Sequence, residues 1–309
     1  MLSRFGEVQI AAYHPFSAAT LNTFTSPYLQ DLMVFAGVVD VFAAAPELLE
    51  RLLRVSVSTS GVYRVTLAVA EALAMDDLLA PIEEQPAYLQ IDGSLISTDD
   101  GWREIKVARV YPRNAQTGEA DLVASRYCAH LGNHTDFMEQ VGTLVPPDCP
   151  LVILSDGAAW IENEVDSRYP AATKILDYYH AVEHLAQAVK GVPLPEDWLA
   201  DQRKALLASE SQQVLGAVEA LPGVNAECAL NLRNYYTHNQ KRMDYATFRL
   251  RGYDIGSGAI EAAHKTLIQI RMKRSGQRWS PKIAPLMLKL RVAYKSQRWQ
   301  AVEKVFANA

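Results

Sequence analysis

The sequence predicts a mixed α/β protein, in which helices flank a mixed β-sheet and both an insertion and the N-terminal region are helical. Three observations support this prediction. Short apolar runs of strand type are separated by helical patterns in the middle of the chain. Residues 193–250 show helical periodicity without strand patterns. The first 80 residues also repeat apolar side chains mostly at intervals of three and four.

Composition describes an ordinary globular protein of 309 residues, 49% hydrophobic and 21% charged. No apolar run approaches the ~20 residues of a membrane span, and the opening residues lack the pattern of a secretory signal. The three cysteines are scattered and odd in number, which is typical of reduced thiols. We therefore expect a cytoplasmic protein without a membrane partner.

The net charge of −5 is unevenly distributed along the chain. Residues 265–309 contain eleven Lys and Arg and a single acid, Glu303, whereas the remainder contains nineteen basic and thirty-four acidic residues. An acidic body with a basic end can bind a polyanion locally while staying soluble. A solvated basic helix face explains the same pattern equally well.

The N-terminal region, residues 1–80, opens with a short extended segment at 7–13 and continues as helices. A polar joint at 55–61 precedes a second helix over 62–73, with Ser58, Thr59, Ser60, Tyr63 and Arg64 near its start. This layout resembles a helix-turn-helix DNA reader, although plain helical packing accounts for it too.

The central sheet is predicted from the order of its elements. Residues 87–91 and 102–111 read as two strands joined by a hairpin, and residues 121–129 contribute a third strand. A helix over 137–144 precedes a buried-type strand at 151, and residues 173–180 form a further strand that runs into a helix. This order is that of a ribonuclease H-like sheet, in which the first and fourth strands lie side by side.

Two strands of this predicted sheet end in an aspartate that is followed by a glycine, which would form a turn. Asp92 precedes Gly93 at the end of the first strand, and Asp156 precedes Gly157 at the end of the fourth. Asp-Gly is a common turn dipeptide, so either pair alone is weak evidence for a site. Adjacent strands would nevertheless bring the two carboxylates together.

A third carboxylate follows the helical insertion of residues 193–250. Gly256-Ser-Gly-Ala-Ile-Glu261 opens a helix that continues to about Arg271, and Glu261 falls in its first turns, where it can face the sheet. A carboxylate that merely complements the helix dipole is the competing interpretation.

Two aspartates and a glutamate are hard oxygen ligands that suit Mg²⁺ or Mn²⁺. Two such ions, about 3.5–4 Å apart, can activate a water or a 3′-hydroxyl and stabilise the leaving oxygen of a phosphodiester. In this arrangement Asp92 would bridge both ions, and Asp156 and Glu261 would each hold one.

Taken together, the motifs resemble the DDE transposases of bacterial insertion sequences of the ISKra type, relatives of the Mutator-like group, over residues 85–300. The motifs that carry the resemblance are Ile91-Asp-Gly93, Leu154-Ser-Asp-Gly-Ala-Ala-Trp-Ile161, Leu176-Asp-Tyr-Tyr-His180, Gly256-Ser-Gly-Ala-Ile-Glu261 and Arg271-Met-Lys-Arg-Ser-Gly-Gln-Arg-Trp279. The resemblance implies a ribonuclease H-like catalytic domain with the catalytic triad Asp92, Asp156 and Glu261. It divides the chain into a possible DNA-binding region at 1–80, a catalytic core at 87–192 and 251–309, and an all-helical insertion at 193–250.

The family also tends to carry an Asp or Cys shortly before a His after the second catalytic aspartate, and Asp177 and His180 match this pattern. The resemblance implies that the histidine contacts the scissile phosphate or a flanking strand while the aspartate fixes its tautomer. A helix-start aspartate beside a surface histidine is the competing interpretation. Residues beyond Glu261 are expected to contact DNA: Arg271, Lys273, Arg274, Arg278, Trp279 and Lys282. Trp279 fits a core anchor equally well.

The resulting functional prediction is a transposase that uses Mg²⁺ or Mn²⁺ to cleave DNA and transfer a 3′-hydroxyl strand. Its partners would be the double-stranded DNA of the element ends and the target, and a second copy of itself, in the nucleoid. Relatives would be expected to carry more sequence before the catalytic domain, which puts autonomous transposition in question. The alternatives are a non-catalytic DNA-binding derivative, such as a repressor, and a ribonuclease H-like nuclease.

Overall fold

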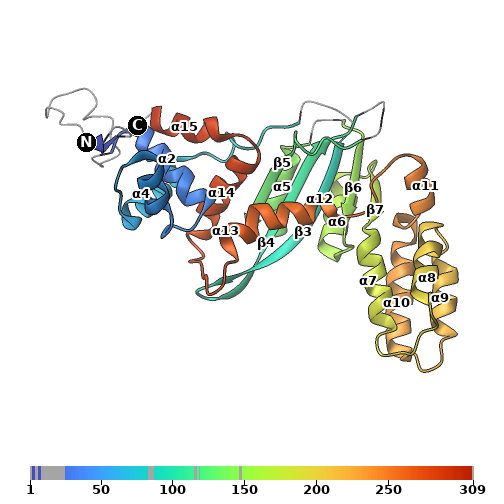
Figure 1. Cartoon of the computed structure of the whole chain (residues 1–309). Helices are drawn as coiled ribbons and strands as arrows, with labels where there is room; N and C mark the ends of the chain where they lie inside the picture. Colours follow the sequence, from blue (N-terminus) through green and yellow to red (C-terminus); the bar gives the residue numbers. More distant parts are fainter. Residues whose placement is uncertain are drawn as a thin grey trace.

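The structure, a computed structural model, describes residues 2–3, 6–7, 25–82, 87–114, 117, 119–145 and 148–307. Its centre is a five-stranded mixed sheet with helices on both faces (Figure 1). The strands are β3 (Ala87–Thr98), β4 (Gly101–Pro112), β5 (Arg126–Leu131), β6 (Leu151–Ser155) and β7 (Thr173–Leu176). A separate pair, β1 (Leu2–Ser3) and β2 (Gly6–Glu7), precedes them. The rest of the predicted extended opening, at 8–13, lies outside the described residues.

The strand order in the sheet is β5-β4-β3-β6-β7. β3 pairs with β6 in parallel, Tyr88 lying opposite Val152, so the predicted adjacency of the first and fourth strands is confirmed. β4 is antiparallel to both β3 and β5, and β7 is parallel to β6. The carboxyl end of β6 therefore lies beside the middle of β3, which is where a site between them can form.

The β3–β4 hairpin is longer than the sequence predicts. β3 continues seven residues beyond Ile91. Ile96 of β3 and Ile105 of the neighbouring β4 are both buried, so the apolar face of the hairpin extends with the strand. Gly101 closes the hairpin with a φ of 116°, a backbone conformation that favours glycine. β6 pairs with β3 only as far as Gln90, so the hairpin extends beyond the parallel part of the sheet.

Helices cover the two faces of the sheet unequally. On one face α5 (His134–Gly142) and α6 (Ala159–Arg168) close a core of β-strand side chains such as Leu89, Ile91 and Ile153. On the other face lie α12 (Gly258–Ala263), the π-helical segment η2 (His264–Gln269) and α13 (Ile270–Met272). These three segments form one almost continuous helix across the sheet (Figure 1).

The helices near the two ends of the chain pack against each other at one side of the sheet (Figure 1). They share one apolar core, and Trp299 donates a hydrogen bond to Asp31 at 2.8 Å. This helical lobe consists of α2 (Pro27–Val39), α3 (Ala45–Leu53), α4 (Thr59–Ala72), α14 (Ala284–Lys295) and α15 (Trp299–Ala307). Our prediction assigns the last two helices to the catalytic core. In the structure α14 packs against β5 of the sheet as well as against α4 and α2, and α15 packs against α2 and α4.

The predicted insertion is helical and lies at the opposite end of the sheet (Figure 1). Its elements are α8 (Trp198–Leu207), α9 (Ser211–Glu219), α10 (Ala226–Asn239), the 3₁₀ turn η1 (Gln240–Arg242) and α11 (Tyr245–Leu250). α10 packs along α7 (Tyr178–Ala188), the helix that follows β7. None of the helices in the described ranges combines the length and the apolarity that crossing a bilayer requires.

Candidate active site

Asp92 lies within β3, on the central strand of the sheet. The prediction that it stands at the end of its strand is wrong, because β3 continues to Thr98. Gly93 therefore forms no turn; instead, a Cβ at this position would lie 2.3 Å from a carboxylate oxygen of Glu104, so glycine makes room for that side chain. The carboxylate of Asp92 accepts a hydrogen bond from the Gly93 amide at 2.7 Å and stays about one-third exposed.

Asp156 follows the last residue of β6, as predicted. Gly157 has a φ of 84°, so here the glycine does provide a turn that an L-residue would strain to adopt. The carboxylate accepts a hydrogen bond from the Ala158 amide at 2.9 Å. This short Asx-type contact fixes the side chain at the start of the loop before α6.

Glu261 lies in α12, and two polar side chains from the sheet position that helix. Gln90 of β3 accepts a hydrogen bond from the Ile260 amide at 2.8 Å. Arg109 of β4 donates to the Ala259 carbonyl at 2.8 Å. Both side chains are buried, so the helix is fixed to the sheet beside Glu261.

The three predicted carboxylates line one cavity of about 150 Å³. Asp177, His180 and Glu183 line it as well, together with Ser257. The fold therefore brings the three predicted carboxylates to one cavity, although long stretches of chain separate them. Carboxylates dominate the wall, and this chemistry suits a hard cation rather than an apolar ligand.

The carboxylates fit a magnesium or manganese centre by donor type but do not form a closed one. Within the described part of the chain, no three His, Cys, Asp or Glu side chains are grouped closely enough to hold an ion. Oδ2 of Asp92 lies 3.1 Å from Nε2 of His264, an ion-pair distance without hydrogen-bond alignment. Binding of an ion would require the carboxylates to move toward one another.

Asp177 has a structural role that differs from the predicted one. Its side chain is 5% exposed and caps α7, accepting hydrogen bonds from the Tyr179 amide and from the amide and hydroxyl of Ser257. Burial raises its pKa above the usual value, and these hydrogen bonds offset the effect only in part. The Ser257 hydroxyl is also 3.0 Å from Oε1 of Glu261. With one proton, it can donate to only one of the two carboxylates at a time.

His180 lines the cavity, but Asp177 does not set its tautomer. Nδ1 of His180 lies 3.5 Å from Oε2 of Glu183, one turn further along α7, so the structure corrects the partner that the motif implied. The ring also lies beside His184, with 4.9 Å between the ring centroids. Burial lowers the pKa of His184 below its usual value, so this second histidine favours the neutral form.

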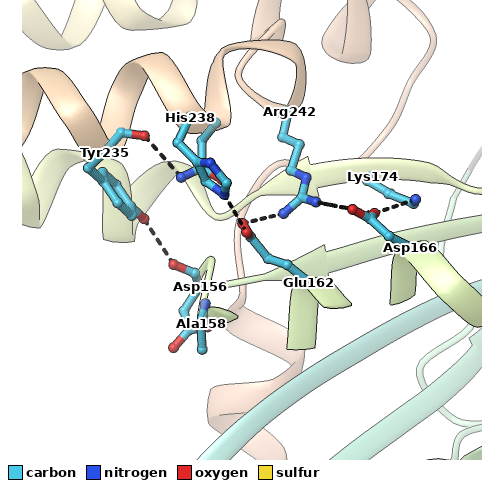
Figure 2. A network of polar contacts seen from close by, with 9 residues as sticks. Asp156, Ala158, Glu162, Asp166, Lys174, Tyr235, His238 and Arg242 are labelled. Carbon is cyan, nitrogen blue, oxygen red and sulfur yellow. Dashed lines mark hydrogen bonds and ion pairs between the residues drawn. The ribbon is translucent and has the colours of Figure 1, made fainter. Parts of the chain in front are cut away.

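The insertion contacts the site through Tyr235 of α10. Its hydroxyl donates to the backbone carbonyl of Asp156, and its ring stacks on His184 with centroids 3.9 Å apart. Figure 2 shows this contact beside a chain of ion pairs that joins α10 and η1 to α6. In that chain the buried Glu162 pairs with His238 at 2.6 Å and with Arg242. The insertion is thus fixed directly to the loop that carries Asp156.

The predicted DNA-contacting residues divide into two groups. Arg271 is 1% exposed: it donates to the Gly37 carbonyl at the end of α2 and lies between the rings of Phe42 and Trp279. Trp279 is buried too and donates to the Met272 carbonyl, so it is a core anchor. The prediction that these two contact DNA is therefore corrected. The remaining four are wholly or partly exposed: Lys273, Arg274, Arg278 and Lys282.

Three residues that the sequence analysis did not single out contribute to the site. Gln90 is a polar residue in an otherwise apolar strand, a signal that could have been used. His264 stands three positions after Glu261, which places both on one face of a helix. Tyr235 had no sequence signal, since a tyrosine in a helical stretch is ordinary core composition.

Comparisons with known proteins assign the chain to no family. No protein-family model matches the chain, and no curated protein matches it. One solved structure, described as the crystal structure of NurA with manganese, aligns at 11% identity over 82% of this chain and 66% of that chain. Its TM-score is 0.11, which is too low to support a shared fold.

Proposed function

We propose that the protein is a transposase that uses divalent metal ions to cleave DNA at the ends of an insertion sequence and to transfer the freed 3′-hydroxyl strand. The observation that carries the proposal is the convergence of Asp92, Asp156 and Glu261 on one cavity. The strand order supports the ribonuclease H-like assignment, because Asp92 lies on β3 and Asp156 directly follows the neighbouring parallel strand β6.

In the proposed mechanism, Asp92, Asp156 and Glu261 would hold the Mg²⁺ or Mn²⁺ ions. Bound ions would activate the attacking oxygen and stabilise the leaving oxygen of the phosphodiester. The protein's own contribution is to position the carboxylates. Gln90 fixes the helix of Glu261, and Tyr235 fixes the loop of Asp156.

DNA binding is proposed for the exposed basic residues beyond α13. Lys273, Arg274, Arg278 and Lys282 can neutralise phosphates and so position a duplex without reading its sequence. Two element ends must be processed together in transposition, so we propose a homo-oligomer, at least a dimer, that acts on nucleoid DNA. Recognition of the ends would fall to α3 and α4, two helices joined by residues 54–58.

The test uses DNA that carries the inverted repeats flanking the reading frame. We expect nicking and strand joining that require Mg²⁺ or Mn²⁺, and loss of both in Asp92→Asn, Asp156→Asn and Glu261→Gln. Glu196→Gln, an exposed carboxylate in the insertion, is the matched control and should keep full activity.

Three other results would lead elsewhere. Cleavage that survives in all three variants would refute the site. DNA binding without cleavage under any metal would favour the non-catalytic DNA-binding derivative. Cleavage without joining would favour a ribonuclease H-like nuclease.

A further inference from the structure

A second cavity, of about 340 Å³, lies between the tip of the β3–β4 hairpin and the loop of residues 273–278. Lys273, Arg274 and Arg278 line it, and none of its lining residues is acidic. Trp102 forms part of the wall and is 69% exposed. An indole this exposed adds little to the core, so packing does not explain it.

Hydrogen bonds hold the wall of this pocket in place. Trp279, which ends the loop, pairs with the edge of β3: its amide donates to the Ser97 carbonyl, and its carbonyl accepts from the Asp99 amide, both at 3.1 Å. Within the loop, the Gln277 amide donates to the Arg274 carbonyl at 3.0 Å. The loop is therefore ordered against the hairpin, and the cations are presented from a fixed backbone.

The cations differ in how far their charge is compensated. Arg274 forms an ion pair with Asp40 at 2.7 Å. Lys273 meets only a hydroxyl, that of Ser94, at 3.1 Å. The described residues provide no ion-pair partner for Arg278. Lys273 and Arg278 are thus available to an anionic ligand.

The pocket is connected to the candidate active site along the edge of β3. β6 leaves that edge after Gln90, and the loop reaches it again at Ser97. Residues 91–96 pair with β4 along their other edge, but no described strand pairs with them along this one, over a length of roughly 20 Å at the usual strand rise. Lys273 contacts Ser94 within this interval. A DNA strand that leaves Asp92 across this edge would pass Lys273 before it meets the pocket.

We propose that this pocket binds one unpaired nucleotide of the DNA substrate, its base stacked on Trp102 and its phosphates on Lys273 and Arg278. The inference rests on the proposed function, since it takes DNA as the substrate. Every base has a π-face, so stacking on an indole tolerates any sequence, and it requires a base that is free of its own stack. Inside a duplex both faces of every base are covered by the neighbouring base pairs, so only the terminal pairs have an open face.

The test compares binding of two fluorescent DNAs of unrelated sequence, a blunt duplex and the same duplex with a single-stranded 3′ overhang, in EDTA. We expect Trp102→Ala to weaken binding of the overhang DNA about tenfold while leaving the blunt duplex within about twofold. Trp102→Phe should recover part of the loss, because phenylalanine also stacks. Leu250→Ala, at an apolar side chain of similar exposure in the insertion, is the control and should change neither affinity.

The cations are tested in the same assay. Lys273→Ala and Arg278→Ala should weaken overhang binding and reduce its salt dependence, whereas Lys190→Ala, at an exposed lysine in the turn after α7, should not. The pocket assignment would be overturned if Trp102→Ala weakened binding of both DNAs equally or of neither. It would also be overturned if the wild type showed no preference for the overhang DNA. This assay measures binding and not cleavage, so it is independent of the test of the transposase. If the wild type cleaves no DNA but its preference for the overhang is lost on Trp102→Ala, the transposase proposal is refuted and the pocket assignment holds.

Discussion

The hydroxyl of Tyr235 lies 2.9 Å from the backbone carbonyl of Asp156, and it donates a hydrogen bond across 79 residues of sequence. The ring is oriented independently by its stack on His184. This contact makes the helical insertion part of the candidate active site, since it sets the position of one proposed metal ligand. It also explains how a segment that contributes no carboxylate to the cavity can affect the chemistry there.

Replacing Tyr235 by phenylalanine should slow DNA cleavage about tenfold, which corresponds to roughly 1.4 kcal/mol of transition-state stabilisation. The ring and its stack are kept, so only the hydrogen bond to Asp156 is lost. Tyr236→Phe is the matched control, because it removes a similar hydrogen bond, to the Ala181 carbonyl at 2.8 Å, away from the cavity. Both variants should lose about 1 kcal/mol of unfolding free energy. Equal cleavage rates in the two would show that the insertion has no positioning role.

Divalent metal should stabilise the folded protein. At a concentration of Mg²⁺ or Mn²⁺ one hundred times the dissociation constant, binding to the folded state alone contributes about 2.7 kcal/mol to the free energy of unfolding. Thermal unfolding with and without metal measures this shift. Asp92→Asn should largely abolish it, whereas Glu196→Gln should keep it in full. A shift that is identical in the two variants would place the ion elsewhere.

Asp177 should make stability depend on pH in the acid range. Its pKa is raised in the folded state, so the folded protein binds the proton more tightly than the unfolded chain, whose value is near 3.8. Its contribution is therefore fully present below that value and is lost as pH rises through the folded pKa. Asp177→Asn mimics the protonated side chain and should remove this loss.

Denaturant unfolding of wild type and Asp177→Asn, measured at several pH values, checks this prediction. The stability of the wild type relative to the variant should decrease as pH rises from about 4 and become constant above the folded pKa. Asp177→Ala lacks the cap of α7 and should be less stable than Asp177→Asn by about 1 kcal/mol at every pH, because neither side chain titrates. If the free energy of unfolding of the wild type relative to Asp177→Asn increased with pH, the assignment would be contradicted.

Two arginines of the basic C-terminal segment should behave in opposite ways. Arg271→Ala removes a buried side chain that caps α2 and packs between two aromatic rings, so we expect a loss of roughly 3 kcal/mol of stability. Arg278→Ala should leave stability unchanged within about 0.5 kcal/mol and weaken DNA binding, with a salt dependence reduced by about one phosphate contact. Chemical unfolding and DNA titrations at several salt concentrations separate the two. A stable Arg271→Ala that binds DNA poorly would reverse our assignment.

The sequence predicts the sheet and the composition of the cavity because both depend on local patterns. Alternating and buried-type apolar runs identify the strands, and the strand order places Asp92 beside the strand that ends at Asp156. The length of β3 was underestimated, because Asp-Gly reads as a turn when neighbouring strands are not known. In the fold, Gly93 instead lies against the carboxylate of Glu104 within a continuous strand.

The fate of the basic residues could not be predicted in the same way. Whether an arginine is exposed depends on distant carbonyls: Arg271 and Arg291 are buried because they reach Gly37 and Val38 at the C-terminal end of α2. Similarly, Lys289 donates to the Leu73 carbonyl at the end of α4. Their positive charges suggest a binding surface when only the composition is known. In the fold, these three side chains instead donate hydrogen bonds to carbonyls at the C-terminal ends of helices.

The packing of the first helices against the last has a consequence for synthesis of the protein. α2 and α4 leave the ribosome early, but the apolar side chains of α14 and α15 that cover them are made only when residues 284–307 have been translated. Until then the nascent chain carries an uncovered apolar surface through the production of the entire sheet and insertion. Chaperone dependence during translation, and aggregation of products that stop before residue 284, are the expected cost of joining the two ends.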